Sequence, residues 1–132
     1  MDRELQEKLK EKALEARAHA YAVYSGYTVG AAALGASGAI YAGCNVENAS
    51  YGLTMCAERN AVFAAVAAGE KKLRAILIVG PEDGEKPYPC GACRQVLAEF
   101  AESPDMPILV AAPDGGCETY TLGDLLPHGF QL

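Results

Sequence analysis

The feature that most restricts the fold of this chain is an alternation of helix-forming stretches with short apolar runs. Residues 2–23 carry Leu, Ala and Val at intervals of three and four with charged residues between them, which predicts an amphipathic helix that stops at Gly26. Two extended stretches follow at 28–35 and 39–45, joined by the short segment Ala36-Ser37-Gly38, and they predict a β-hairpin. Their content of Ala, Val, Ile and Gly suits strands that are covered on both faces.

The rest of the chain continues the alternation. Residues 57–68 predict a second helix that ends at Gly69, and residues 91–102 predict a third that stops before Pro104. The other segments are expected to be strands at 75–79, 108–112 and 117–121, a loop at 81–89 and a turn at Asp114-Gly115-Gly116. This order of elements predicts an α/β sandwich in which a mixed sheet has helices on both faces.

Length and composition narrow the class of protein. The 132 residues contain no low-complexity tract, repeat or long linker, so we expect one domain over 1–132 that needs no disulfides to fold. Eleven Lys and Arg against seventeen Asp and Glu give a formal charge of −6, which argues against a role in coating nucleic acid. No apolar run approaches the ~20 residues of a membrane span, and the first residues are charged and lack a signal peptide's apolar region. We therefore expect a cytoplasmic protein without a membrane partner.

Cysteine is the residue type that points to chemistry. The chain has five cysteines, an odd number that in a reducing compartment favours metal or redox chemistry over disulfides. Three of them lie in Cys56-Ala57-Glu58 and Pro89-Cys90-Gly91-Ala92-Cys93, where each segment enters an expected helix. A helix N-terminus stabilises a thiolate, and two cysteines three residues apart share one side of a first helical turn. Three thiolates can hold zinc and leave its fourth position open, as in catalytic sites.

Glu58 is a poor ligand for the same metal, because residues two apart on a helix point in different directions. It is a better candidate to lean over the open position and accept a proton from a water there. Three other interpretations remain open at this point. The pair Cys90 and Cys93 could be a redox pair, Cys44 or Cys117 could close a structural zinc site, or the cysteines could be inert core residues.

Four blocks of sequence carry a resemblance to a known family. Cys-Ala-Glu is followed about thirty residues later by Pro-Cys-Gly-Ala-Cys-Arg-Gln-Val, the arrangement of all-cysteine zinc deaminases. The other blocks are Tyr24-Ser25-x-Tyr27-x-Val29-Gly30-Ala31-Ala32, Gly43-Cys44-Asn45-Val46-Glu47-Asn48-Ala49-Ser50-Tyr51 and Leu125-Leu126-Pro127. In this order and spacing the chain resembles the zinc-dependent cytidine deaminases over nearly its whole length.

The resemblance implies a role for each matching residue. Cys56, Cys90 and Cys93 would hold one zinc ion per chain, Glu58 would carry protons, and Arg59 would donate hydrogen bonds to the zinc thiolates. The residues implied to contact substrate are Tyr27 on the pyrimidine, Asn45 and Glu47 on the sugar 3′-hydroxyl, and also Ala57 and Phe130. Cys44 and Cys117 are read as core thiols, and neither His19 nor His128 is given a role. The chain departs from the family in having Tyr27 where Phe is more frequent and Val23 where Pro is common.

The fold implied by the resemblance is a three-layer α/β/α sandwich with a mixed five-stranded sheet, and the assembly implied is a homotetramer with its sites at subunit contacts. The implied reaction is hydrolytic deamination of cytidine and 2′-deoxycytidine to uridine and 2′-deoxyuridine, with release of ammonia, in pyrimidine salvage. The partner would be a free nucleoside and not a nucleic acid. Two alternatives stay open: a related deaminase acting on an aminated cytosine antibiotic such as blasticidin S, and a non-catalytic module stapled by zinc.

Overall fold

The computed structural model describes residues 1–82, 84–112 and 115–132. Its elements in chain order are α1 (Arg3–Arg17), β1 (Gly30–Gly35), β2 (Ile40–Cys44), the 3₁₀ helix η1 (Tyr51–Leu53), α2 (Ala57–Ala67), β3 (Leu73–Val79), α3 (Gly91–Phe100), β4 (Pro107–Ala111), β5 (Cys117–Thr121) and α4 (Leu122–Leu125). The loop expected at 81–89 and the turn expected at Asp114-Gly115-Gly116 each include positions outside the described residues.

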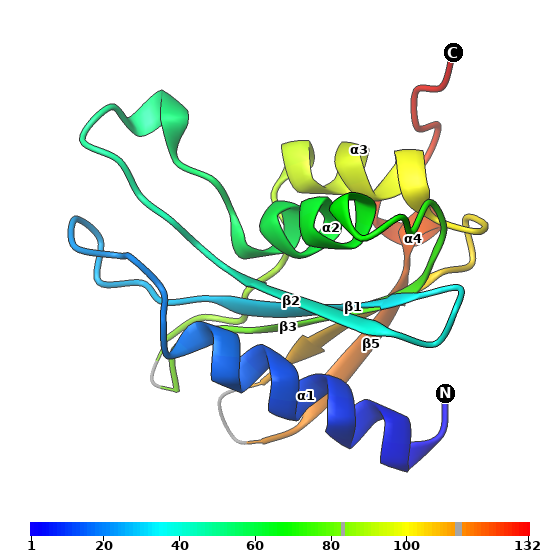
Figure 1. Ribbon diagram of the computed structural model, residues 1–132, viewed down its shortest axis with the longest axis horizontal. Helices are drawn as coiled ribbons and strands as arrows, with labels where there is room; N and C mark the ends of the chain where they lie inside the picture. Colours follow the sequence, from blue (N-terminus) through cyan, green and yellow to red (C-terminus); the bar gives the residue numbers. More distant parts are fainter. Residues whose placement is uncertain (83, 113–114) are drawn as a thin grey trace.

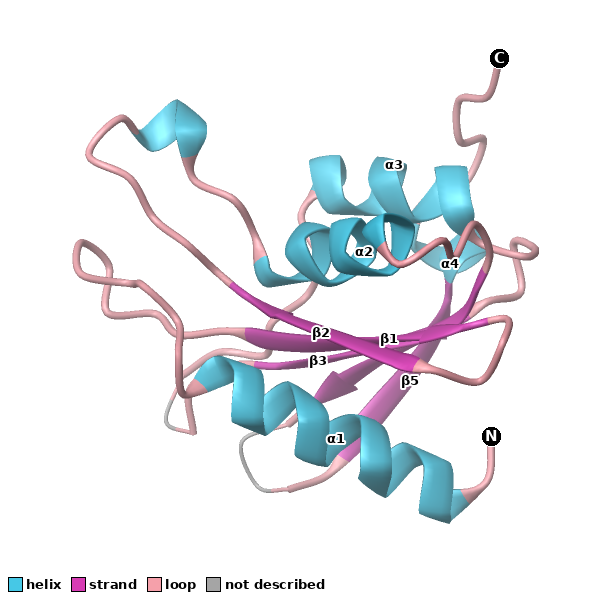
Figure 2. Cartoon of the chain, viewed as in Figure 1, coloured by secondary structure: helices cyan, strands magenta, loops and turns pink. Residues whose placement is uncertain are grey.

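The strands form one mixed sheet in the order β2-β1-β3-β4-β5. β3 and β4 are parallel, and every other neighbouring pair is antiparallel. Helix α1 covers one face of the sheet, and α2, α3 and α4 lie on the opposite face (Figures 1 and 2). The expected α/β/α sandwich with a mixed five-stranded sheet is confirmed.

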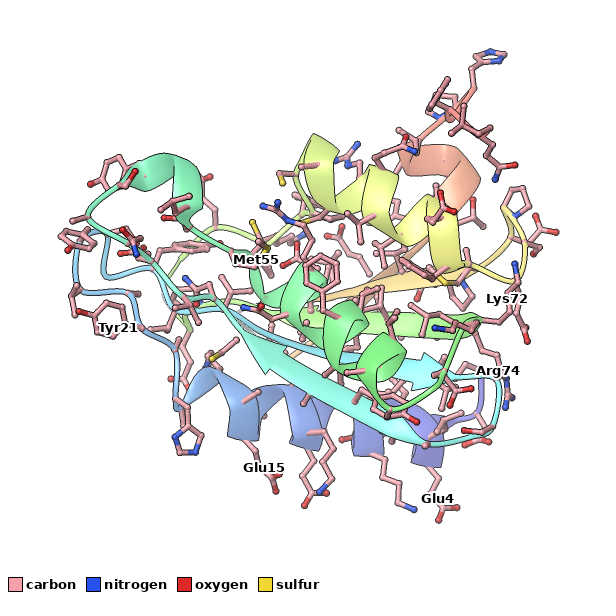
Figure 3. All side chains as sticks on the ribbon, turned by 45° about the horizontal axis from the view of Figure 1, so that its top comes forward. Glu4, Glu15, Tyr21, Met55, Lys72 and Arg74 are labelled. Carbon is pink, nitrogen blue, oxygen red and sulfur yellow. The ribbon has the colours of Figure 1, made fainter. Side chains whose placement is uncertain are left out.

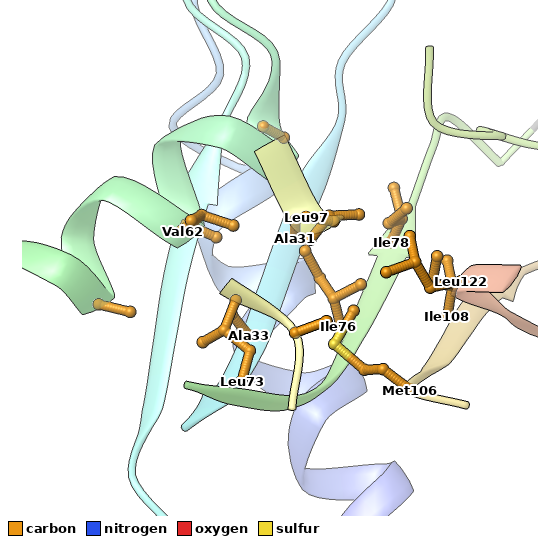
Figure 4. Close-up of a cluster of buried hydrophobic side chains, with 14 of the residues drawn as sticks. Ala31, Ala33, Val62, Leu73, Ile76, Ile78, Leu97, Met106, Ile108 and Leu122 are labelled. Carbon is orange, nitrogen blue, oxygen red and sulfur yellow. The ribbon is translucent and has the colours of Figure 1, made fainter. Parts of the chain in front are cut away.

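The core is divided by the sheet because successive side chains of a strand point to opposite faces. On the face of α2 and α3, β1 contributes Ala31 and Ala33 to a cluster that includes Val62, Leu97 and Ile76 (Figure 4). The alternate residues of β1 pack under α1 together with Leu9 and Ala13. Small residues let the first helix lie close to the sheet, since a Cβ on Gly30 would come within 2.0 Å of the carbonyl oxygen of Ala13.

The first helix is shorter than expected, which corrects the prediction of a helix over 2–23. It ends at Arg17, because the chain beyond it pairs with the extension of β2. The backbone N–H of Tyr21 donates to the carbonyl of Asn45 at 3.0 Å, and the N–H of Glu47 donates to the carbonyl of Tyr21 at 2.8 Å. These long-range bonds hold the segment around Tyr21 against the residues that follow β2. The segment is therefore not part of α1.

The other boundaries lie within two residues of the expected ones. β3 begins at Leu73 and α3 ends at Phe100, because Ala101 turns to extended backbone and bridges to Leu73. The short helix α4 is an element that the sequence analysis did not anticipate. It begins with a capping box in which Thr121 and Asp124 bond each other's backbone N–H groups. In the described ranges no helix combines the length and the apolar character that crossing a bilayer requires.

Candidate metal centre and substrate pocket

Three thiols meet where α2 and α3 begin. Cys56 and Cys90 are the N-cap residues of the two helices, and Cys93 lies in the first turn of α3. The three Sγ atoms lie within 4.8 Å of one another, with 3.5 Å between those of Cys90 and Cys93. Neither N-cap side chain bonds the backbone of its own helix, so both sulfurs are left available to another partner. Met55, labelled in Figure 3, marks the chain as it enters this site.

The thiol cluster fits a zinc ion. Zinc–sulfur bonds of about 2.3 Å in a tetrahedral site place thiolates roughly 3.8 Å apart, a spacing close to that of this cluster. Among the described residues no further Cys, His, Asp or Glu joins the group. Cys44 lies at the end of β2 and Cys117 packs on the core under α1, so neither closes the site. The arrangement is that of a three-ligand site with an open fourth position.

The surroundings of the cluster favour a thiolate at Cys56. The pKa of Cys56 is lowered to about 5, first because the Cys93 thiol donates to its sulfur and also because Arg59 adds positive charge. The pKa of Cys93 is raised by the same shared proton and by burial. A cation between the two sulfurs would replace that proton. Arg59 donates from Nη2 to Sγ of Cys56 at 3.3 Å.

Glu58 is a buried carboxyl beside the thiols. It is 5% exposed in the first turn of α2, and it is not part of the three-thiol group. Burial, with a smaller contribution from the negative charge of Cys56, raises its pKa to about 7. A carboxyl with such a pKa can both accept and release a proton near neutral pH.

A cavity of about 450 Å³ opens beside the thiols and Glu58, and its volume is within the usual range for small-molecule sites. It is lined by Ser25, Tyr27, Val29, Asn45, Glu47, Thr54, Cys56, Glu58, Lys86, Pro87, Tyr88 and Cys90. The structure thus brings together most of the residues that the sequence singled out. A larger cavity of about 620 Å³ lies elsewhere, between the ends of α3 and α4, and none of the expected site residues lines it.

Asn45 joins the ends of two strands at the wall of this cavity. Its Oδ1 accepts from the N–H of Val29 at 2.9 Å, and its Nδ2 donates to the carbonyl of Tyr27 at 2.8 Å. The side chain is 9% exposed. Asn45 therefore fixes the segment that carries Tyr27, and among the described residues the second N–H of its amide has no acceptor.

Glu47 holds the preceding turn. Its Oε1 accepts from the N–H groups of Tyr24 and Ser25 at 2.9 and 3.1 Å, and its Oε2 accepts from the Ser25 hydroxyl. These bonds lower the pKa of Glu47, chiefly through the Ser25 side chain, so the carboxylate stays charged. The anchoring of this turn by Asn45 and Glu47 is a role that the sequence analysis did not foresee.

Of the other three residues expected to contact substrate, only Tyr27 lines the cavity. Tyr27 lines the cavity, and its hydroxyl donates to the carbonyl of Glu85 at 2.9 Å. Ala57 is fully buried as the first residue of α2. Phe130 does not line the cavity, because it lies on the C-terminal segment that extends away from the sheet, with 66% of its surface exposed.

Sequence reasoning missed six residues of the cavity wall: Ser25, Val29, Thr54, Lys86, Pro87 and Tyr88. Ser25 and Val29 stand in a block that had been singled out as a whole, so their position was a usable signal. Thr54 lies outside every such block, and the other three lie in the proline-rich loop before Cys90, which composition alone marked only as irregular.

Comparisons with known proteins agree with this geometry. The family described as "Cytidine and deoxycytidylate deaminase zinc-binding region" matches residues 3–108. A cytidine deaminase of Sporosarcina psychrophila is 45% identical over 95% of this chain and 90% of its own length. The crystal structure of cytidine deaminase from Burkholderia pseudomallei superposes with a TM-score of 0.87 at 45% identity, covering 98% of this chain and 100% of that one. The crystal structure from Mycobacterium tuberculosis has a TM-score of 0.81 at 44% identity, covering 96% and 98%.

Proposed function

This chain belongs to the zinc-binding cytidine and deoxycytidylate deaminase family, and on that premise we propose how its own residues carry out the reaction. It is a zinc-dependent enzyme that hydrolyses cytidine to uridine and ammonia. We extend the substrates to 2′-deoxycytidine and place the reaction in pyrimidine salvage. The observation that carries the proposal is that Cys56 and Cys90 of the three-thiol group line the same cavity as one buried carboxyl, that of Glu58.

The proposed ligands are Cys56, Cys90 and Cys93. Zinc, when bound, supplies the Lewis acidity that makes a water nucleophilic near neutral pH. Three thiolates around a divalent ion leave a net negative charge, which weakens that acidity. The positive ends of the helix dipoles of α2 and α3, which begin at Cys56 and Cys90, offset this charge, and so does the guanidinium of Arg59, which donates to Cys56.

Glu58 is the proposed proton carrier. Its carboxylate accepts a proton from the attacking water and delivers it to N3 of the cytosine ring while the oxygen bonds to C4. It then takes the remaining proton from that oxygen and passes it to the amino group, so that the C4–N bond breaks, ammonia leaves and C4 keeps a carbonyl oxygen. Its burial next to the thiols supports this role, because a pKa of about 7 matches both halves of the transfer.

The sugar-binding role of Asn45 and Glu47 is supported by what their hydrogen bonds leave over. Within the part of the chain that the structure describes, Asn45 keeps one free N–H, and Oε2 of Glu47 keeps one acceptor position after bonding Ser25. One donor and one acceptor can bracket a single hydroxyl group. A cytidine within a polynucleotide has its 3′-oxygen esterified, so we expect polynucleotides to be refused.

The base is proposed to lie between Tyr27 and the start of α2. The ring of Tyr27 would stack on the pyrimidine, and Ala57 would contact it through its backbone, because the first N–H groups of a helix have no partner within that helix. A sugar-gripping pair favours a nucleoside over an aminated cytosine antibiotic. A buried proton-transfer group favours catalysis over a zinc-stapled module.

We also propose a homotetramer of single-domain chains, located in the cytoplasm, where a reducing environment keeps three thiolates free. Exposed apolar side chains support the assembly: Tyr51 is 71% exposed and meets Tyr24 edge-to-face at 6.0 Å. Phe130, held through its carbonyl by Gln95, is proposed to reach a neighbouring subunit's cavity. Light scattering should give four times the mass of one chain, and a fully active monomer would refute the assembly.

The proposed function is tested by ammonia release from cytidine, measured before and after treatment with a chelator. We expect release that stops on chelation and returns with zinc. Cytidine, free cytosine and a short single-stranded oligonucleotide are compared side by side. Efficient turnover of the oligonucleotide would contradict the free-nucleoside assignment.

A further inference from the structure

Glu118 is a carboxylate on β5 at which three side-chain donors converge. The Lys86 ammonium pairs with its Oε2, and the hydroxyls of Tyr88 and Tyr120 both donate to its Oε1, that of Tyr88 at 2.9 Å. The two tyrosine rings also pack edge-to-face, with 5.9 Å between their centroids. These contacts lower the pKa of Glu118 to about 2, with Lys86 the largest cause, so the carboxylate stays ionised.

Two of these partners belong to the cavity wall, although Glu118 does not. Lys86 and Tyr88, with Pro87 between them, line the cavity next to Cys90. Residues 85–89 form neither helix nor strand, and a hydrogen bond from the N–H of Tyr88 to the carbonyl of Lys86 makes a tight local turn. The position of this wall therefore depends on side chains that reach it from other elements.

We propose that Glu118 is a positioning residue that sets the affinity of the enzyme for its nucleoside by holding Lys86 and Tyr88 in the wall of the cavity. The inference rests on the proposed function of that cavity. The wall has a second tether on its other side, where the Tyr27 hydroxyl donates to the carbonyl of Glu85. Glu118 acts from outside the cavity, across the 30 residues that separate it from Tyr88 in the sequence.

The wall is a binding element and not part of the proton path, so its displacement has a specific kinetic signature. Contacts that are equally strong in the ground state and the transition state change KM and leave kcat unchanged. Loss of Glu118 should therefore weaken nucleoside binding while the metal site and Glu58 continue to work. A role confined to folding would instead lower the amount of active enzyme and leave KM the same.

The test compares Glu118→Gln with wild type and with Glu99→Gln, a control that removes an exposed carboxylate on α3. Glutamine keeps an acceptor for the tyrosines and loses the charge that holds Lys86. We expect KM for cytidine to rise about ten-fold, with kcat within about two-fold of wild type and one zinc per chain. The Kd for uridine, measured by calorimetry, should rise in parallel, and Glu99→Gln should match wild type in every respect.

Unchanged KM and unchanged uridine affinity in Glu118→Gln would overturn the proposal, and so would a fall in kcat that accompanies loss of zinc. If that variant does not fold, Tyr120→Phe decides the question, because it removes one donor to Glu118 and keeps the ring that packs against Tyr88. A KM increase of about two-fold or more supports the role, and an unchanged KM refutes it. A wild-type chain that releases no ammonia would refute the proposed function. The role of Glu118 would then be tested by the Kd for uridine alone, compared between Glu118→Gln and wild type.

Discussion

Arg59 donates a hydrogen bond from Nη2 to the Sγ of Cys56 across 3.3 Å, one turn along the same helix. The guanidinium is thereby fixed beside the three thiols, and its Nε is buried without a hydrogen-bond partner among the described residues. Burial of an unpaired donor destabilises a fold, so the position of Arg59 lowers the stability of the chain. The same position brings a positive charge to a site of three thiolates.

Replacing Arg59 with Gln should weaken the metal centre without emptying it. The substitution keeps an amide donor and removes the charge, so we expect a loss of about 10- to 100-fold in zinc affinity or in kcat. Competition with a chromogenic chelator and steady-state kinetics measure the two quantities. Arg74→Gln is the matched control, because Arg74 is exposed on β3 away from the thiols (Figure 3). Wild-type values for both quantities in Arg59→Gln would contradict the role.

The ligand set predicts which cysteines the metal needs. Cys56→Ala, Cys90→Ala and Cys93→Ala should each lose zinc, because two thiolates cannot complete the site. Cys44→Ser and Cys117→Ser should keep one zinc per chain, as measured by elemental analysis of the purified proteins. If Cys44→Ser released zinc as readily as Cys93→Ala, the site would be a closed one.

Ser25→Ala should impair nucleoside binding through Glu47. The serine hydroxyl donates to Glu47 and accepts from the N–H of Tyr27. Its loss therefore removes one bond that holds Glu47 and one that holds the turn before Tyr27. We expect KM for cytidine to rise by roughly ten-fold, since hydrogen bonds to charged groups contribute about 1.5–3 kcal/mol. Ser37→Ala is the matched control. Ser37 lies between β1 and β2, and its hydroxyl likewise donates to a carboxylate, that of Glu70. Equal kinetics of the two variants would show that the turn has no special role.

The lowered pKa of Glu70 predicts that the stability of the fold depends on pH. Hydrogen bonds from Ser37 lower its pKa below that of an ordinary glutamate, and Tyr41 adds a smaller effect. A lowered folded-state pKa stabilises the fold above the unfolded pKa, and this stabilisation is lost as the pH falls through the folded one. Glu70→Gln should therefore lower the free energy of unfolding more at pH 7 than at pH 3, as measured by urea denaturation. A difference from wild type that grows towards pH 3 would reverse the sign and contradict the assignment.

The thiol cluster could be predicted from sequence because its causes are local. Cys56 and Cys90 each stand directly before a helix, and Cys93 follows three residues after Cys90, so spacing alone places the sulfurs near helix N-termini. The layered α/β fold was predictable for the same reason, since periodicity and glycine positions mark the elements one at a time.

The parts that could not be predicted depend on contacts between distant segments. The end of α1 at Arg17 is decided by the pairing of Tyr21 with residues 45–47, and no local signal reports that pairing. The convergence of Lys86 and Tyr88 on Glu118 likewise appears only after β5 is placed in the sheet. Glu47 was expected only as a sugar contact, because its bonds to the turn at Ser25 depend on the same long-range fold.

The central claim is that Glu58 moves protons for a zinc ion held by three cysteines, and one paired measurement on Glu58→Gln tests it most directly. Zinc content and the rate of cytidine deamination are determined on the same preparation, beside wild type. The account predicts one zinc per chain and a rate reduced by at least about 10²- to 10⁴-fold, because glutamine cannot carry the proton. Loss of zinc from the variant, or turnover close to that of wild type, would contradict it.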